Sequence, residues 1–398
     1  MRTYSELFSL REFRVLFGTQ CLTVLSGAMG SLALGTITYK ATGSPLLSAL
    51  SMFGGPLVRL VGSWFLLSLS DLLPPRRAML LVAGSLLVTD LLQAIPSVSW
   101  PMRFVLLAIP WLVMSGTSGT AMALMSEIVP ADAFVLGRST LNISVGVMQI
   151  VGYAAAGLLL LLLSTTDLFL VAALAMAFSF ALIRLGLRDR PPRATGGGVA
   201  SRTRAVNRRL LGSPVLRPVY LCLWVPNGLI VGCEALFVPF AVEKAGYLFA
   251  ATAAGMLAGD IVVGRFVPEA VRDRLVEPLR FLLALPYLGF VLVPSLPVAA
   301  VVGMVASFGY SASLPLQERL VTRTAPEERG QVLGLNSTGM MVMQGLGAVL
   351  GGAIAELLGH GAPAAAHAVA VMAVLSVLVS LALIPGLRRS RERVHSEL

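Results

Sequence analysis

One short pattern occurs twice in this chain, each time inside a long apolar segment. The first copy is Gln149-Ile-Val-Gly152 with Ala156-Gly157 behind it, and the second is Gln344-Gly-Leu-Gly347 with Gly351-Gly352 behind it. The second copy follows the first at one constant offset, and each copy comes after a turn that contains proline and acidic residues. A duplicated set of apolar helices predicts two related bundles, an architecture typical of secondary transporters.

The composition requires that most of the chain lies in a membrane. Of the 398 residues, 56% are hydrophobic and only 13% are charged, whereas soluble domains carry about 25% charged residues. A helix of roughly 20 apolar residues crosses the hydrocarbon core, and about twelve such segments account for most of the length. We therefore expect an all-α polytopic membrane protein without a soluble catalytic domain.

The net charge of +10 raises the question of a nucleic-acid partner, and the placement of the basic residues answers it. Lysine and arginine accumulate in the cytoplasmic loops of membrane proteins. We place Lys40, Arg103 and Lys244 on the outer side, Arg59 alone within a span, and the other basic residues in inner loops. This asymmetry indicates a multi-pass protein of the cell (inner) membrane with both termini cytoplasmic, and no nucleic-acid partner.

A basic stretch divides the chain into two halves. Residues 188–213 are rich in arginine and contain a glycine triplet, which is typical of a flexible linker. We expect a six-helix bundle over 1–187, this cytoplasmic linker, a second six-helix bundle over 214–387 and a cytoplasmic tail over 388–398. The three cysteines show no metal-ligand spacing, and we expect neither a metal nor a cofactor.

Several segments carry a family resemblance that extends over essentially the full length. Residues 11–14 (Arg-Glu-Phe-Arg) and 39–45 (Tyr-Lys-Ala-Thr-Gly-Ser-Pro) look like the opening of the bacterial drug-efflux members of the major facilitator superfamily. Residues 326–330 leading to Gln344 resemble their eleventh helix. The resemblance implies twelve helices in two six-helix pseudo-repeats, a cavity lined largely by helices 1, 4, 7 and 10, alternating access, and a monomer.

The family's signature loop between helices 2 and 3 is present in part. Asp71 and the basic pair that follows it stand in place, but Leu67 replaces the usual glycine. A carboxylate at this boundary is favoured beside a helix N-terminus, although an ordinary solvated loop is an equal alternative. The resemblance implies a cytoplasmic gate with these members: Asp71, Arg76, Arg77, Glu127, Gly264 and Arg265.

The family's antiporter signature in helix 5, roughly Gly-Pro-x-x-Gly-Gly, is also incomplete. Here the proline is lost and one glycine is Ala156. Small residues still allow membrane helices to approach closely, so the packing role survives while the indication of export weakens. The expected helix-packing glycines are Gly152, Gly157, Gly347, Gly351 and Gly352.

Ionisable residues within a span are costly and usually face a partner or a cavity. Arg59 and Asp90 share a depth on helices 2 and 3, and we expect an ion pair that either braces the bundle or takes part in gating. Glu234 on helix 7 has no basic residue at comparable depth, so it suits proton coupling unless it lies close enough to the outer surface to be solvated. Asp260 on helix 8 has Arg265 nearby as an alternative partner. The proton-coupling candidates are Glu234, Asp90 and Asp260.

The cavity helices otherwise supply small polar, aromatic and polarisable groups. Such groups adapt to amphipathic organic molecules, although packing explains many of them individually. The substrate-cavity candidates are Trp111, Ser115, Ser118, Trp224, Asn227, Ser307, Tyr310 and Gln344.

These features predict a secondary active transporter that exports an amphipathic small molecule, a drug or natural product, in exchange for protons. An importer of a nutrient or metabolite with the same fold is the alternative. A membrane-embedded enzyme is disfavoured, because the sequence has no zinc-type spacing, nucleophile elbow or phosphate-binding loop. The expected partners are therefore a small-molecule substrate, protons and the lipid bilayer.

Overall fold

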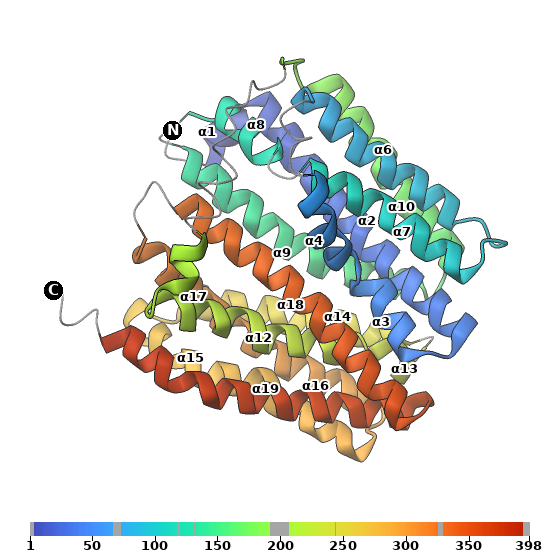
Figure 1. The fold of residues 1–398 in the computed structure, drawn as a ribbon, viewed down its shortest axis with the longest axis vertical. Coiled ribbons are helices and arrows are strands. Elements are labelled where there is room, and N and C mark those ends of the chain that lie inside the picture. The colour runs from blue at the N-terminus through green and yellow to red at the C-terminus, as the bar shows by residue number, and fades with distance from the viewer. Residues whose placement is uncertain are drawn as a thin grey trace. The chain divides into compact units, whose positions relative to one another are not determined.

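The chain is helical wherever its structure is described. The computed structural model describes residues 4–66, 73–117, 120–130, 133–191, 207–242, 244–324 and 329–392, and these ranges contain no strand (Figure 1). Within them, nine helices are long and apolar enough to cross a membrane, or ten if the bent pair α3 and α4 forms one span. The all-α polytopic architecture predicted from the composition is confirmed.

The chain divides into two compact units. The first comprises residues 1–41 and 55–195, and the second comprises residues 42–54 and 196–398. The short helix α3 (Pro45–Phe53) therefore belongs to the second unit, although the helices on either side of it in the sequence belong to the first.

The first unit is built around α6, which packs against both α7 and α10, while α4 packs against α7. The expected third and fourth spans correspond to α6 and α7. Its helices are α1 (Tyr4–Ser9), α2 (Arg11–Thr42), α4 (Gly55–Leu66), α6 (Pro75–Gln93), α7 (Trp100–Gly116), α8 (Thr120–Ile128), α9 (Phe134–Leu159) and α10 (Thr165–Gly186).

Arg103, which we expected on the outer side, is buried and closes the end of α6. Its guanidinium donates to the main-chain oxygen of Gln93 at 2.6 Å, to the Gln93 side chain at 3.1 Å and to the main-chain oxygen of Ile95 at 3.2 Å. The last carbonyls of a helix lack partners within the helix, and a basic side chain can satisfy them. The turn from α6 into α7 is thus held by one arginine.

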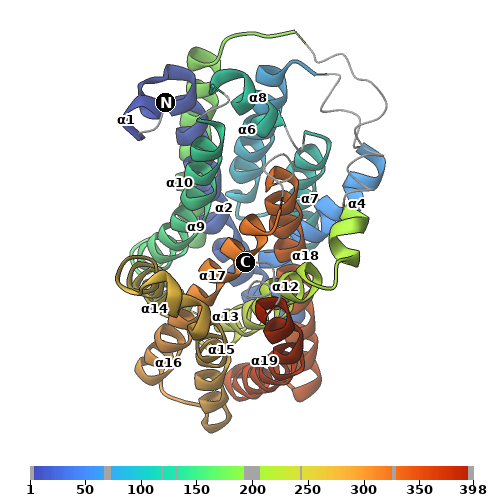
Figure 2. The ribbon, with the colours of Figure 1, turned by 90° about the vertical axis from the view of Figure 1, so that its left-hand side faces the viewer.

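The second unit is built around α12, which packs against α18 and α19, while α14 packs against α16 (Figures 1 and 2). Besides α3, its helices are α12 (Leu216–Glu234), α13 (Phe237–Phe240), α14 (Ala245–Ile261), the π-helix η1 (Val262–Phe266), α15 (Glu269–Ala284), the 3₁₀-helix η2 (Leu285–Leu292), α16 (Leu296–Phe308), the 3₁₀-helix η3 (Gly309–Ala312), α17 (Ser313–Thr322), α18 (Arg329–Leu358) and α19 (Gly361–Glu392).

Glycines bring the backbones of α12 and α18 into direct contact. A Cβ atom on Gly347 would overlap the carbonyl oxygen of Gly228, and one on Gly351 would lie 2.6 Å from the carbonyl oxygen of Gly232. Both helices therefore present two glycines four residues apart, the spacing that allows close crossing in a membrane. The next glycine, Gly352, faces α3 instead, where a Cβ would lie 2.8 Å from the Cα of Leu46.

The first copy of the repeated pattern makes a similar approach within the first unit. A Cβ on Gly152 of α9 would lie 2.7 Å from the Cβ of Ala28 in α2. Gly157, at the end of the same copy, is buried. Small residues thus mark close helix contacts in both copies.

We predict that Gly347→Ala destabilises the protein by about 1–3 kcal/mol, because the added methyl group must separate two backbones that touch. The melting temperature of the purified protein in detergent measures the effect. Gly146→Ala on α9 is the matched control, since a Cβ there meets nothing within 4 Å and alanine favours the helix by up to about 1 kcal/mol. Equal melting temperatures for the two variants would contradict the proposed close contact.

Candidate functional site

Glu234 lies at a break in the helix that carries it. It is the last residue of α12, and α13 begins only at Phe237, after a tightened turn in which Leu236 N–H donates to the Cys233 carbonyl at 3.1 Å. The carbonyl end of a helix carries a partial negative charge that favours cations. Interrupted helices form ion and substrate sites in transporters. The half-buried carboxylate of Glu234 therefore lies where a cation is favoured.

A second carboxylate, that of Asp260, interacts with one of the residues that interact with Glu234. Tyr310 in η3 interacts electrostatically with both Asp260 of α14 and Glu234, and Tyr287 in η2 interacts with Glu234. We call Glu234, Asp260, Tyr287 and Tyr310 the carboxylate cluster. In the part of the chain that the structure describes, neither carboxylate forms an ion pair, and Asp260 Oδ1 is buried without a hydrogen-bond partner. The alternative partner Arg265 is exposed in η1.

Further polar atoms of the second unit are buried and unsatisfied. The hydroxyls of Tyr287 and Ser307 lie close to each other, yet neither has a hydrogen bond of normal geometry. Asn227 Nδ2 on α12 is likewise without a partner. Buried polar groups are nearly always hydrogen-bonded, so these atoms are available to bind a polar ligand group.

Trp224, another cavity candidate of the second unit, is held against α18. Its indole Nε1 donates to the carbonyl oxygen of Asn336 at 3.1 Å and to the Asn336 side chain at 3.0 Å. The indole ring lies over Gly339, where any Cβ would overlap it. This arrangement gives Trp224 a packing role. Gln344, further along α18, is half-buried.

The cavity candidates of the first unit lie between α4 and α7. Trp111 covers the backbone of Gly55, and Ser115 lies against Gly62 while donating to the Leu112 carbonyl of its own helix at 2.7 Å. These contacts explain both side chains as packing. Ser118 lies outside the described residues.

Asp90 is not brought together with Arg59. It is 7% exposed on α6, and its Oδ2 accepts a hydrogen bond from Ser26 of α2 at 3.1 Å. Arg59 is half-buried on α4, and these two described residues form no ion pair. Equal depth along two helices does not give their facing direction, and α4 packs against α7 rather than α6. The expected Arg59–Asp90 pair is absent from this structure.

Near the start of α2, one arginine joins two carboxylates. Arg190, four residues beyond α10, donates to both oxygens of Glu12 at 2.9 and 2.7 Å, and its Nε lies 3.3 Å from Glu127. The hydrogen bond that Arg190 donates to Glu12 raises the pKa of Arg190 above its usual value, with smaller contributions from the charges of both carboxylates. Arg190, at the start of the basic stretch, thereby links the gate candidate Glu127 to Glu12 of α2.

The other gate candidates are dispersed. Arg76 donates to the carbonyl of Arg184 in α10, while Arg77 is exposed. The carbonyl of Gly264 accepts a hydrogen bond from Arg272 at 2.7 Å, so this glycine closes the turn between η1 and α15. Asp71 lies outside the described residues.

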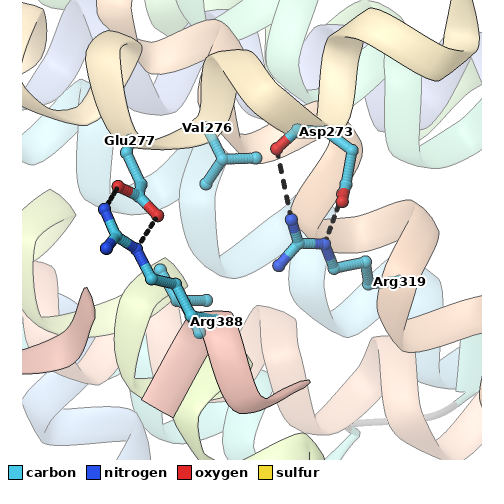
Figure 3. A pocket seen from close by; sticks show the side chains of 6 residues that line it. Asp273, Val276, Glu277, Arg319 and Arg388 are labelled. Atoms are coloured by element: carbon cyan, nitrogen blue, oxygen red, sulfur yellow. Dashed lines mark hydrogen bonds and ion pairs between the residues drawn. The ribbon is translucent and has the colours of Figure 1, made fainter. Parts of the chain in front are cut away.

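Sequence reasoning missed two ion pairs that join α15 to α17 and to α19 in the second unit (Figure 3). Arg319 of α17 binds Asp273 of α15 with Nε–Oδ1 at 2.5 Å, and Arg388 of α19 binds both carboxylate oxygens of Glu277 at 3.0 and 2.8 Å. A small hollow lies between the pairs, with Val276 at its centre. Acidic residues at four-residue spacing on α15 were the available signal.

Arg280 was also missed, and it corrects the expectation that Arg59 alone lies within a span. It falls inside the apolar stretch Val271–Leu292 and is only 5% exposed. The prediction that places Arg280 in an inner loop is therefore wrong, because α15 continues through this residue. Its guanidinium donates to the carbonyl of Cys222 in α12.

This arrangement of helices is known from other proteins. Residues 240–397 match the family model of the Major Facilitator Superfamily. The inward-facing, unoccupied structure of a bacterial homologue of the human lysosomal transporter Spinster is similar, with a TM-score of 0.68 at 13% identity over 96% of this chain and 97% of that one. The chain has the major facilitator fold.

A second similar structure is a POT family transporter in complex with 5-aminolevulinic acid. Its TM-score is 0.69 at 13% identity, over 96% of both chains. No curated protein matches the sequence. The fold is thus shared at low sequence identity, and a place in the drug-efflux branch stays a prediction.

We predict that Arg59→Met and Asp90→Asn act independently on stability. Their effects on the free energy of unfolding in detergent should add to within about 0.5 kcal/mol, as for sites without contact. A buried ion pair would behave differently, because removal of one partner typically costs about 3–5 kcal/mol while removal of both costs less. A coupling energy of about 3 kcal/mol or more would contradict this prediction and indicate that Arg59 and Asp90 form an ion pair.

Proposed function

We propose that this protein is a secondary active transporter that works by alternating access and exports an amphipathic small molecule in exchange for protons. The observation that carries the proposal is the carboxylate cluster, in which Glu234 and Asp260 share Tyr310 without a basic partner among the described residues. An intramembrane carboxylate without a counter-charge is costly, so a mobile cation is its natural partner. Protons and cationic substrates both meet that need.

Exchange of the two cations at one carboxylate provides a coupling mechanism. A proton on Glu234 neutralises the site, and a cationic group of the substrate does the same after the proton leaves. Because the two ligands compete for one charge, binding of either favours release of the other. The opposing movements are coupled when each ligand carries the site between its inward-open and outward-open states.

Aromatic side chains around Glu234 support a substrate with apolar parts. Phe237 packs edge-on against Phe249 at a ring-centre distance of 5.2 Å, and it lies 6.5 Å from Tyr287. Phe240 and Phe290 pack at 5.3 Å. Aromatic faces bind apolar groups and attract organic cations. These rings beside two carboxylates fit an amphipathic cation better than a sugar.

The rest of the proposal concerns the setting of the transporter. The basic inner loops support placement in the cell membrane with both termini in the cytoplasm. Small organic ligands are also bound by structures of the same fold, namely the POT family transporters in complex with 5-aminolevulinic acid and with a thioalcohol-conjugated peptide. We propose a monomer with bundles over 1–187 and 214–387.

We predict that Glu234→Gln abolishes proton movement driven by substrate. The wild type is reconstituted in liposomes with a proton-sensitive dye inside and is challenged with lipophilic cations, including tetraphenylphosphonium, and with polar nutrients. A lipophilic cation should drive proton movement in the wild type, and the rate with Glu234→Gln should fall to that of protein-free liposomes. Asp189→Asn, which removes an exposed carboxylate beyond α10, is the control and should behave as the wild type.

Other outcomes of the same experiment have definite meanings. Proton entry together with a nutrient would replace export by import. Coupled movement that persists in Glu234→Gln would transfer the proton site to Asp260 or Asp90, and Asp260→Asn and Asp90→Asn would then decide between them.

A further inference from the structure

Helix α12 contains a proline that leaves one of its carbonyl groups without a partner. Pro226 lies inside the helix and has no N–H, so the carbonyl four residues earlier, that of Cys222, receives no hydrogen bond from the helix backbone. Arg280 of α15 fills this place, because its Nη1 donates to the Cys222 carbonyl. A side chain from a neighbouring helix thus supplies the hydrogen bond that Pro226 removes from the backbone of α12.

The environment makes a charged donor at this position expensive. Arg280 is 5% exposed and Cys222 is 1% exposed. No carboxylate pairs with Arg280 among the described residues, and its Nε and Nη2 are buried without hydrogen-bond partners. Among the described residues, the Cys222 carbonyl is the one hydrogen-bond acceptor of this guanidinium. Because burying the charge is costly, we infer that the hydrogen bond to this carbonyl is important.

The first unit solves the same problem with a neutral group. Pro110 lies inside α7 and frees the carbonyl of Leu106, which accepts a hydrogen bond from the Thr89 hydroxyl of α6 at 3.4 Å. A charged donor forms a hydrogen bond roughly twice as strong as a neutral one. The carbonyl freed in α12 is therefore bound more firmly than the carbonyl freed in α7.

Helix α12 is anchored to α18 on both sides of Pro226. Before Pro226, the Tyr220 hydroxyl donates to the Val332 carbonyl of α18 at 3.3 Å. After Pro226, Gly228 and Gly232 touch the backbone of α18, and the helix ends at Glu234. The contact from Arg280 of α15 lies between these anchors, at the Cys222 carbonyl.

We propose that Arg280 is a positioning residue for Glu234: by binding the Cys222 carbonyl, it sets the bend of α12 at Pro226 and so places the carboxylate at the end of that helix. The inference rests on the proposed coupling role of Glu234. It makes the bend, rather than the charge of Arg280, the quantity that matters for transport.

A substitution that restores the backbone N–H missing at Pro226 separates the effect of the hydrogen bond from the effect of the charge of Arg280. Arg280→Met removes the donor, and Pro226→Ala supplies the Cys222 carbonyl with a hydrogen bond from its own helix. The carboxyl stretching band of Glu234, identified by its loss in Glu234→Gln, is followed by infrared spectroscopy as a function of pH, together with the coupled transport rate. Cys233, Tyr287 and Tyr310, the other titratable groups that interact with Glu234, are unchanged.

The expected results follow from the hydrogen bond. Arg280→Met should shift the midpoint of the Glu234 titration and lower the coupled rate about tenfold, the equivalent of one such bond. The double variant Pro226→Ala/Arg280→Met should recover the midpoint and rate of Pro226→Ala alone. Arg280→Lys, which keeps a charged donor on a differently shaped side chain, should fall between wild type and Arg280→Met.

Two results would overturn the proposal. One is an unchanged Glu234 midpoint in Arg280→Met. The other is a double variant whose Glu234 midpoint differs from that of Pro226→Ala alone, since the charge of Arg280, and not its hydrogen bond to the Cys222 carbonyl, would then govern Glu234. The infrared titration needs no transport, so it tests the positioning role even if proton-coupled transport fails in the wild type.

Discussion

The close crossing of α12 and α18 is the contact on which the second unit depends. Gly228 and Gly232 meet Gly347 and Gly351 with backbone against backbone. Larger side chains at these positions would prevent this contact. Because α12 cannot shift along α18 without collisions, its end at Glu234 is held at a defined place. We propose that Pro226 and the hydrogen bond from Arg280 to the Cys222 carbonyl then determine how the carboxylate is directed.

Charge is distributed differently at the ends of the units and within the membrane. At the helix ends, carboxylates are paired with arginines, as in Glu12 with Arg190 and Asp273 with Arg319. Within the spans that the structure describes, Glu234, Asp260 and Arg280 have no ion-pair partner. Exposed pairs contribute little to stability, whereas unpaired intramembrane charges are costly and usually serve transport. We therefore propose that the unpaired groups carry the transport function.

Much of the architecture was predictable because it depends on the composition and on the repeated pattern, which can both be read directly from the sequence. The all-α membrane fold followed from the low charge, and the repeated pattern led to Gly347 and Gly351 before their contacts were known. The Arg59–Asp90 pair was not predictable, since depth along a helix does not give the direction of a side chain. Arg280 was missed for a similar reason: the carbonyl freed by Pro226 can be read from the sequence, but the helix that supplies its donor depends on tertiary packing.

The central claim is that one carboxylate exchanges a proton for a cationic substrate, and a proton count tests it most directly. Purified protein in weakly buffered detergent solution is titrated with tetraphenylphosphonium while proton release and ligand binding are both measured. The account predicts release of protons on binding by the wild type and none by Glu234→Gln. Binding without proton release by the wild type, or equal release by both proteins, would contradict it.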